Sequence, residues 1–193
     1  MQHYGYISNN FLGGLYSYVC VVSLYDEHPF EHEFFLRISR SFPFMHKLPL
    51  VSLHAQNRKQ SNKSIDDNQK LSIIRHFYLT ELDIQHVHDD YIEEFLSDMK
   101  TCLQNDIFLE VNFKSLERIA HNFKKDDTRI NCGEINKMYL YRKVEYDFQS
   151  VHDYFCFCKN MLIVMICYSY KIDYSYIKRK NIVLHTVMKK QCL

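Results

Sequence analysis

The sequence contains very little glycine, proline or tryptophan, with 4 Gly, 3 Pro and no Trp in 193 residues. This scarcity excludes a collagen-like chain, which needs glycine at every third position, and a chain built of flexible linkers. Long apolar runs are also missing. The longest covers residues 161–168, whereas a helix that spans a bilayer needs about 18–20 residues. A run of this length is typical of a buried strand.

The seven cysteines include no pair with the C-x-x-C spacing that is typical of zinc knuckles. Cys156 and Cys158 lie two residues apart, which is a weak metal signal, and we expect them to be buried thiols instead. The N-terminal residues are polar and aromatic and lack the basic start of a secretory signal. We therefore expect reduced thiols and a location in the cytosol or the nucleus.

Charges of the two signs nearly balance, because 24 Lys and Arg stand against 23 Asp and Glu, for a net charge of +1. A net charge this small excludes a strongly basic tail that binds nucleic acid, but it does not exclude a local basic groove. The aromatic content is high, with 15 Tyr and 14 Phe. Length and composition together predict a folded protein with one domain that covers residues 1–193.

Strand-like and helix-like segments follow one another in the first part of the chain. Residues 16–24 are rich in β-branched and aromatic side chains and predict a strand. Residues 30–41 have the apolar spacing of a helix. Residues 57–70 are polar throughout and predict a flexible loop, and residues 71–82 predict another strand.

Further along the chain, a helix is expected to begin at Asp89 or Asp90, either of which is suited to cap it, and to run to about residue 103. Residues 107–113 and 116–123 predict two strands. The C-terminal third, residues 131–193, has poor periodicity and is divergent or incomplete. No internal repeat is visible in the sequence.

His76 is the best single candidate for a catalytic residue among the 11 histidines. In an extended strand, His76, Tyr78 and Thr80 lie on one face. An imidazole transfers a proton near neutral pH, and a hydroxyl donates a hydrogen bond to a phosphate oxygen. This spacing suits chemistry on a phosphate, and the alternative is that His76 is a structural residue of the core.

A second histidine motif is found in the segment Gln85-His86-Val87-His88-Asp89-Asp90. Its His-x-His-Asp pattern contains ligand types that bind metals. The alternative interpretation, which we favour, is a polar turn before a helix. No metal site is therefore predicted.

Two stretches, residues 75–103 and 107–130, resemble the U6 small nuclear RNA phosphodiesterase family of the 2H phosphoesterase superfamily. In that family a strand with His-x-Ser is followed by a helix and two strands, and a turn then ends in a Thr-Arg signature. Asp127-Thr128-Arg129 matches this signature, and Gly14-Leu15-Tyr16-Ser17-Tyr18 is similar to the family's entry to its first strand. The resemblance covers about residues 13–130.

The resemblance implies an α+β fold with two lobes, each an antiparallel sheet backed by helices, around a groove. It also implies a metal-independent 3′–5′ RNA exonuclease, a phosphodiesterase that trims the 3′ end of U6 RNA in the nucleus. One histidine takes a proton from the terminal 2′-hydroxyl, which attacks the adjacent phosphate, and a second protonates the leaving 5′-oxygen. The RNA keeps a 2′,3′-cyclic phosphate. We expect no cofactor, no metal, no membrane contact and a monomer.

Carried over to this chain, the resemblance makes His76 the first catalytic histidine. Tyr78 stands where the family has serine, and Thr80 is a possible substitute for its hydroxyl. Tyr78, Thr80 and Tyr16 are the expected contacts to the RNA substrate, either through their hydroxyls or by stacking on a base.

The second histidine motif of the family has no clear counterpart here. In the family's register it falls on Val164 and Ile166, which have no acid–base chemistry, so His185 is the alternative second catalytic residue. Two other hypotheses remain open. One is a catalytically inactive or truncated family member that binds RNA at most, and the other is a small scaffold with no RNA role.

Overall fold

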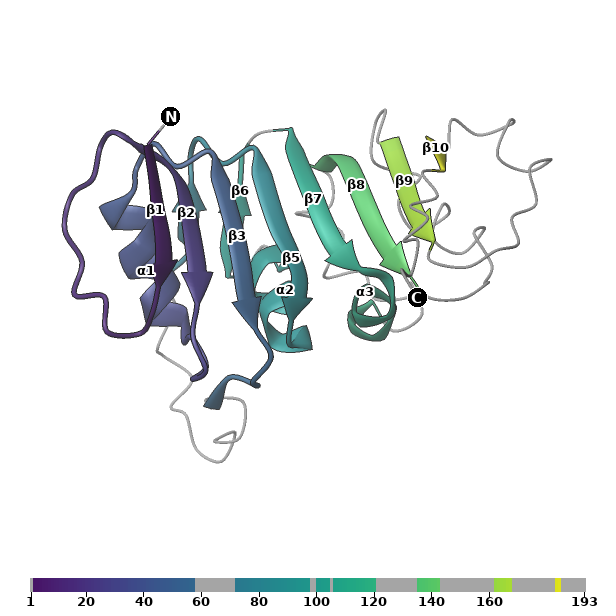
Figure 1. Cartoon of the computed structure of the whole chain (residues 1–193), viewed down its shortest axis with the longest axis horizontal. Coiled ribbons are helices and arrows are strands. Elements are labelled where there is room, and N and C mark those ends of the chain that lie inside the picture. The colour runs from purple at the N-terminus through teal and green to yellow at the C-terminus, as the bar shows by residue number, and fades with distance from the viewer. Residues whose placement is uncertain are drawn as a thin grey trace, which may run out of the picture.

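The computed structural model describes residues 2–57, 72–97, 100–104, 106–120, 135–142, 162–167 and 183–184. These residues form strands and three helices, which confirms the predicted mixed α+β class (Figure 1). In chain order the elements are β1 (Gln2–Ile7), β2 (Val19–Tyr25), α1 (His32–Ser41), β3 (Lys47–Ser52), β4 (Ile74–His76), β5 (Glu81–Val87), α2 (Asp89–Leu96), β6 (Thr101–Leu103), β7 (Ile107–Asn112), α3 (Phe113–Ile119), β8 (Ile135–Arg142), β9 (Leu162–Cys167) and β10 (Val183–Leu184).

The main sheet contains eight described strands in the order β1-β2-β3-β5-β7-β8-β9-β10, and every pairing between neighbours is parallel. The prediction of antiparallel sheets was therefore wrong, and the large strands form one continuous sheet where two were expected. The physical reason is the connection between strands. A parallel neighbour requires a crossover segment, and the helices α1, α2 and α3 lie within such segments.

Strand order follows chain order, so the backbone advances by one coil for each strand, as in an α/β solenoid. One row of paired residues runs across the sheet through Val21, Lys47, Glu81, Phe108, Lys137 and Leu162. Successive members of this row lie 26, 34, 27, 29 and 25 residues apart. The structure thus contains a repeat that was not visible in the sequence, because its length varies from coil to coil.

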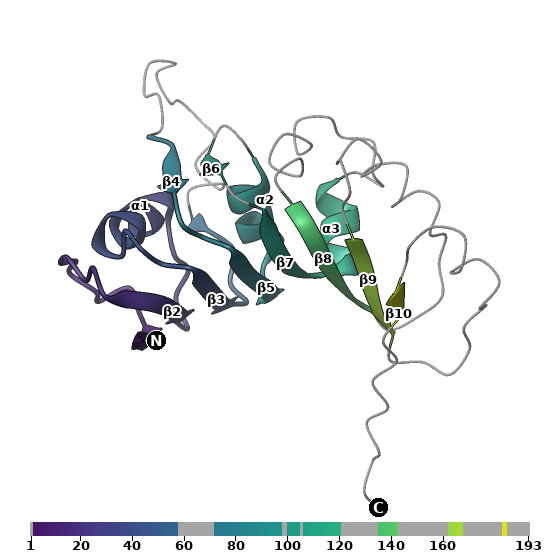
Figure 2. The same ribbon diagram turned by 90° about the horizontal axis from the view of Figure 1, so that it is seen from above.

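The helices all cover the same face of the sheet, as the view in Figure 2 shows. The short strands β4 and β6 pair with each other in a separate parallel sheet, on the same side as the helices. The opposite face of the main sheet carries no helix among the described residues. We call this uncovered side the outer face.

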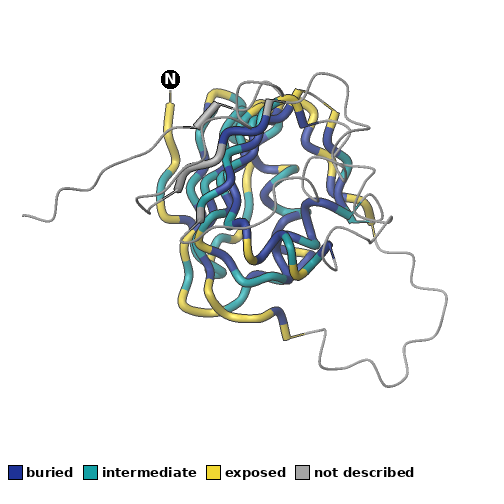
Figure 3. The backbone as a smooth tube through the Cα atoms, turned by 90° about the vertical axis from the view of Figure 1, so that its right-hand side faces the viewer, coloured by how far each residue is buried: buried dark blue, intermediate teal, exposed yellow. Residues whose placement is uncertain are grey.

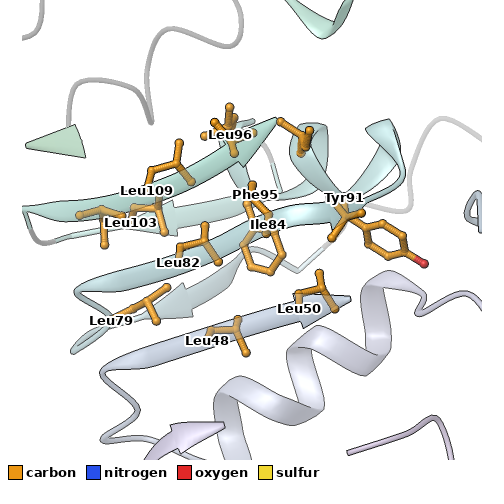
Figure 4. Close-up of a cluster of buried hydrophobic side chains, with 14 of the residues drawn as sticks. Leu48, Leu50, Leu79, Leu82, Ile84, Tyr91, Phe95, Leu96, Leu103 and Leu109 are labelled. Carbon is orange, nitrogen blue, oxygen red and sulfur yellow. The ribbon is translucent and has the colours of Figure 1, made fainter. Parts of the chain in front are cut away.

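The core lies between the sheet and the helices. Buried and half-buried positions alternate along β3, along β7 and over residues 81–85 of β5, because successive side chains of a strand point to opposite faces. Figure 3 shows buried, half-buried and exposed positions along the whole backbone. The strands β2, β3, β5 and β7 each contribute a pair of inward aliphatic side chains two residues apart, such as Leu48 and Leu50 or Leu82 and Ile84. In Figure 4 these side chains lie in adjacent layers, with Phe95 of α2 packed near Ile84.

Several predicted elements are confirmed. The strand predicted over residues 16–24 is β2, and the helix predicted over residues 30–41 is α1. The strand predicted over residues 107–113 is β7. The apolar run at residues 161–168 contains β9, in which Ile163 and Val164 are buried.

Other predictions about local structure were wrong. The strand expected over residues 71–82 is interrupted, since β4 ends at His76 and β5 begins at Glu81. The residues predicted as a strand at 116–123 include the end of helix α3, which begins immediately after β7. The side chain of Asn112 accepts hydrogen bonds from the amides of Lys114 and Ser115 and so starts a helix at this point.

The helix that begins at Asp89 is also shorter than predicted, because α2 ends at Leu96 and residues 101–103 form β6. Its cap differs from the prediction too. His88 holds the N-cap position, and its Nδ1 accepts a hydrogen bond from the amide of Asp90. The predicted loop at residues 58–70, the Thr-Arg signature and most of the C-terminal third lie outside the described residues.

Candidate functional site

His76 ends the short strand β4, and its side chain points into the core. The residue is 4% exposed, and its ring stacks on that of Phe95 with the centroids 6.2 Å apart. In β4 the side chains of Ile74 and His76 are buried, whereas Arg75 between them is exposed. Side chains therefore alternate only within β4 itself, and the face that carries His76 is the buried one.

Burial changes the acid–base chemistry of His76. Desolvation of the charged form lowers the pKa of His76 from 6.5 to about 4. The Nε2 atom is buried and has no hydrogen-bond partner among the described residues. The imidazole is consequently neutral at neutral pH and its Nε2 is shielded from solvent, which does not favour its assignment as a general base.

The predicted substrate contacts do not gather around His76. Tyr78 is about half exposed and packs beside Phe44, with ring centroids 5.1 Å apart. Thr80 is exposed and donates a hydrogen bond of 3.2 Å from its hydroxyl to the carbonyl of His46. The chain leaves the extended conformation after His76, so these side chains do not share its face.

Tyr16 takes part in a separate aromatic cluster near the N-terminus. Its ring stacks on Phe42 at 5.0 Å between centroids and meets Tyr4 edge-on at 5.3 Å. This position indicates a packing role. His185 lies outside the described residues, and Val164 is a buried residue of β9.

A buried ionisable pair lies between α1 and α2. The Nε2 atom of His32 donates to the carbonyl of Ser72 at 2.7 Å, and its Nδ1 lies 2.5 Å from Oε1 of Glu94. The ammonium of Lys100 lies 3.6 Å from the other carboxylate oxygen of Glu94. Both ring nitrogens of His32 are thus occupied by protein atoms, and the pair connects two helices.

A cavity of about 390 Å³ lies between the end of α1 and the strand β4. Its inner wall is formed by the buried side chains of Phe42, Met45 and His76. Two exposed arginines, Arg40 from the last turn of α1 and Arg75 from β4, also line it. The cavity therefore combines an apolar interior with two guanidinium groups, neither of which was singled out from the sequence.

The outer face of the sheet carries a second group of side chains, most of which are polar or aromatic. These residues are half-buried and alternate with the core residues of their strands. By strand they are Lys47, Pro49 and Val51 of β3, Glu81, Asp83 and Gln85 of β5, Phe108, Glu110 and Asn112 of β7, and Lys137, Tyr139 and Tyr141 of β8.

Aromatic rings and a cation meet at one end of the outer face. The rings of Phe108 and Tyr139 pack edge to face with centroids 4.7 Å apart. The ammonium of Lys137 lies 5.5 Å from the centre of the first ring and 4.9 Å from the centre of the second. These distances fit cation–π attraction, so this surface already holds one cation of its own chain.

Carboxylates occupy the middle of the outer face. Glu110 accepts hydrogen bonds from the amide of Gln85 at 2.6 Å and from the hydroxyl of Tyr141 at 2.7 Å. Glu81 pairs with Lys47 at 2.7 Å between Nζ and Oε2. The hydrogen bond to Glu81 is the largest cause that raises the pKa of Lys47, and the charges of Glu110 and Asp83 act in the same direction.

The polar turn expected at Gln85–Asp90 is instead the end of strand β5, in which His86 is exposed. The helix start expected there is present, and His88 caps α2. In the part of the chain that the structure describes, no three His, Cys, Asp or Glu side chains are placed to share a metal ion. Among the same residues, no helix has both the length and the apolar character needed to span a membrane.

No protein-family model matches this chain, and neither a curated protein sequence nor a solved structure does. The resemblance to the RNA phosphodiesterases therefore rests on the sequence motifs alone and stays a prediction. The geometry instead draws attention to the outer face and to the cavity. In the sequence, the residues of the outer face are visible as polar and aromatic residues between aliphatic ones. Only the strand register shows that residues from different strands lie side by side on one surface.

Proposed function

We propose that this chain is a protein-binding solenoid whose outer face receives a basic segment of a partner protein. The observation that carries the proposal is the arrangement of side chains on the outer face. The strand register places carboxylates on β5 and β7 beside the aromatic rings of β7 and β8. Solenoids commonly bind partners over such extended surfaces, because each coil adds one strand's side chains to a continuous face.

The charge on the outer face defines the sign of the partner. Lys47 compensates Glu81, and Lys137 lies on the aromatic rings. Asp83 and Glu110 have no cation within ion-pair distance among the described residues. A lysine or arginine of a partner would supply this missing positive charge, and the neighbouring rings of Phe108 and Tyr139 would attract it further.

The same charge distribution disfavours nucleic acid at this face. Binding to a phosphate backbone depends on lysine and arginine side chains that replace counterions. Asp83 and Glu110, which form no ion pair among the described residues, repel phosphates, so RNA is expected to bind the outer face less well than a basic peptide does.

The test is a binding titration with the full chain. Fluorescence anisotropy would measure the binding of a labelled peptide of alternating Arg and Ser. A peptide of the same length with Glu in place of Arg would serve as the control ligand and is expected to bind more weakly. The double variant Asp83→Asn/Glu110→Gln is expected to weaken binding of the basic peptide by about tenfold or more. Added salt is expected to weaken it in the unchanged protein.

The matched control is Glu117→Gln, which removes one negative charge from α3 on the helix side of the sheet. It is expected to leave the affinity unchanged, and circular dichroism checks that every variant is folded. Equal affinity of the double variant and the unchanged protein, or tighter binding of a 3′-oligouridine RNA than of the basic peptide, would refute the proposal.

A second candidate function is the RNA 3′-end trimming that the sequence resemblance implies. It is favoured by one observation, namely that His76 lines a cavity together with Arg40 and Arg75, whose guanidinium groups suit a phosphate. Burial of Nε2 and the low pKa of His76 count against it.

This second candidate is tested by incubating the protein with a short 3′-oligouridine RNA in EDTA. Shortening of the RNA to an end with a 2′,3′-cyclic phosphate, lost in His76→Ala, would support it. RNA that binds without being shortened would support an inactive relative of the phosphodiesterases. RNA that neither binds nor shortens would leave the protein-binding proposal as the better one.

A further inference from the structure

We infer that the cavity between α1 and β4 binds a small ligand in which an anionic group is attached to an apolar ring. This site is separate from the outer face, because α1 and β4 lie on the opposite side of the main sheet (Figure 2). The inference rests on the volume of the cavity, the two arginines that line it, and the buried imidazole at its wall.

The volume suits a small molecule. At about 390 Å³ the cavity lies within the range of sites that hold such ligands, which is roughly 300–1,000 Å³. Its apolar wall contains the ring of Phe42 and the thioether of Met45, both of which are buried, and the half-exposed ring of Phe77. An apolar ring placed there would leave water and contact these side chains.

The arginines define the charge of the ligand. Arg40 and Arg75 approach the cavity from two different elements, and neither pairs with a carboxylate within the part of the chain that the structure describes. Two guanidinium groups at one cavity repel each other unless an anion lies near them. Carboxylates and phosphates match the planar donor geometry of guanidinium, and either group fits this description.

His76 supplies the third observation. Its Nε2 is buried and has no partner among the described residues, which is destabilising for a polar atom. The residue also lines the cavity, so a bound ligand would lie next to its imidazole ring.

Calorimetric titration of the full chain tests the inference with four probes: phenyl phosphate, benzoate, inorganic phosphate and phenol. Phenyl phosphate or benzoate is expected to bind most tightly, and the tighter of the two identifies the anionic group. Inorganic phosphate and phenol, which each lack one half of the ligand, are expected to bind at least about tenfold more weakly.

The variants Arg40→Gln and Arg75→Gln are each expected to weaken binding of the best probe by about tenfold or more. Lys114→Gln is the matched control, because it removes an exposed positive charge from α3, away from the cavity. It is expected to leave the affinity unchanged. The nitrogen resonance of His76 Nε2 in the unchanged protein is expected to shift when the best probe is added.

Three results would overturn the inference. One is the absence of binding by phenyl phosphate and benzoate at millimolar concentration. Another is an equal loss of affinity in Lys114→Gln and in the arginine variants, which would indicate binding by overall charge. The third is a His76 resonance that stays in place while the probe binds, since the ligand would then lie elsewhere.

Discussion

At the scale of single residues, His76 makes the stability of the protein depend on pH. The folded state keeps this ring neutral down to a pH of about 4, whereas in the unfolded chain it takes up a proton near pH 6.5. Between these values the unfolded state binds the extra proton, so stability falls as the pH is lowered through this window and levels off below it.

The expected loss is about 1.4 kcal/mol for each pH unit, or about 2 kcal/mol between pH 6.5 and pH 5. Urea unfolding of the unchanged protein at several pH values measures it. The variant His76→Gln does not titrate, and its stability is expected to change less over the same window. Parallel curves for the two proteins would show that His76 is not the group responsible.

The buried pair of His32 and Glu94 gives a second prediction for single residues. Because a carbonyl only accepts hydrogen bonds, Nε2 of His32 must carry the proton that it donates to Ser72. A second proton then lies between Nδ1 and the Glu94 carboxylate. Glu94→Ala removes one partner of this buried pair and is expected to cost about 3 kcal/mol or more.

Glu94→Gln is the informative companion, because its amide is able to donate to Nδ1 of a neutral His32 and is expected to cost less than half as much. Glu27→Ala is the control for an exposed glutamate and is expected to change stability by less than about 0.5 kcal/mol. Equal unfolding midpoints for Glu94→Ala and Glu27→Ala in guanidinium chloride would contradict the account of the pair.

At the scale of elements, the start of α2 is held in place by the hydroxyl of Tyr91. This oxygen accepts a hydrogen bond from the amide of Phe30 at 2.9 Å and from the hydroxyl of Ser52 at 3.0 Å. Phe30 precedes α1, and Ser52 ends β3, so one side chain joins three neighbouring parts of the fold. Burial raises the pKa of Tyr91, which keeps its hydroxyl protonated.

Tyr91→Phe leaves the amide of Phe30 and the hydroxyl of Ser52 without this acceptor, at an expected cost of about 1–3 kcal/mol. The control is Tyr25→Phe, at a tyrosine that is 49% exposed, where almost no change is expected. Thermal unfolding of the three proteins measures the difference. A cost in Tyr25→Phe as large as in Tyr91→Phe would refute the role of the buried hydroxyl.

The sequence predicts an element well where local pattern and tertiary environment agree. The alternation over residues 107–113 describes β7, because Ile107, Leu109 and Val111 face the core and the residues between them face outward. Residues 116–123 look like a strand by composition, yet α3 occupies the first of them, since Asn112 caps a helix and Phe113 and Leu116 pack inward one turn apart. Local preference for strand was overridden by packing against the sheet.

The candidate sites were harder to predict than the elements. The sequence placed His76 in a strand, and β4 confirms this, but it did not indicate that Phe95 of a later helix covers the ring. In the same way, Arg40 and Arg75 lie 35 residues apart in the sequence and are brought to one cavity only by the contact of α1 with β4. Such long-range contacts are not encoded in local periodicity.

At the scale of the whole molecule, each coil of the solenoid contacts mainly the next one. Stability is then approximately a sum over coils and their interfaces, and a coil at the end of the array has one neighbour fewer. Among the described strands, β1 lies at the edge of the sheet and is largely exposed, whereas β3, β5 and β7 lie between neighbours on both sides.

Amide hydrogen exchange is therefore expected to be slowest in β3, β5 and β7 and fastest in β1, with a graded order between them. The experiment is exchange followed by NMR or by mass spectrometry under native conditions. Uniform exchange of all these strands in a single step would indicate that the coils unfold together, contrary to the additive picture.

The alternation along the strands separates the residues that stabilise the molecule from those that meet its surroundings. Replacing an outward residue such as Asp83 leaves the inward contacts of Leu82 and Ile84 intact. A substitution on the outer face therefore changes the surface that a partner would meet without changing the core. Related chains can in this way acquire different binding preferences by single substitutions while the fold stays the same. The fold also accommodates a longer connection between neighbouring strands. Lys47 and Glu81 are 34 residues apart in the sequence, yet they are paired across β3 and β5.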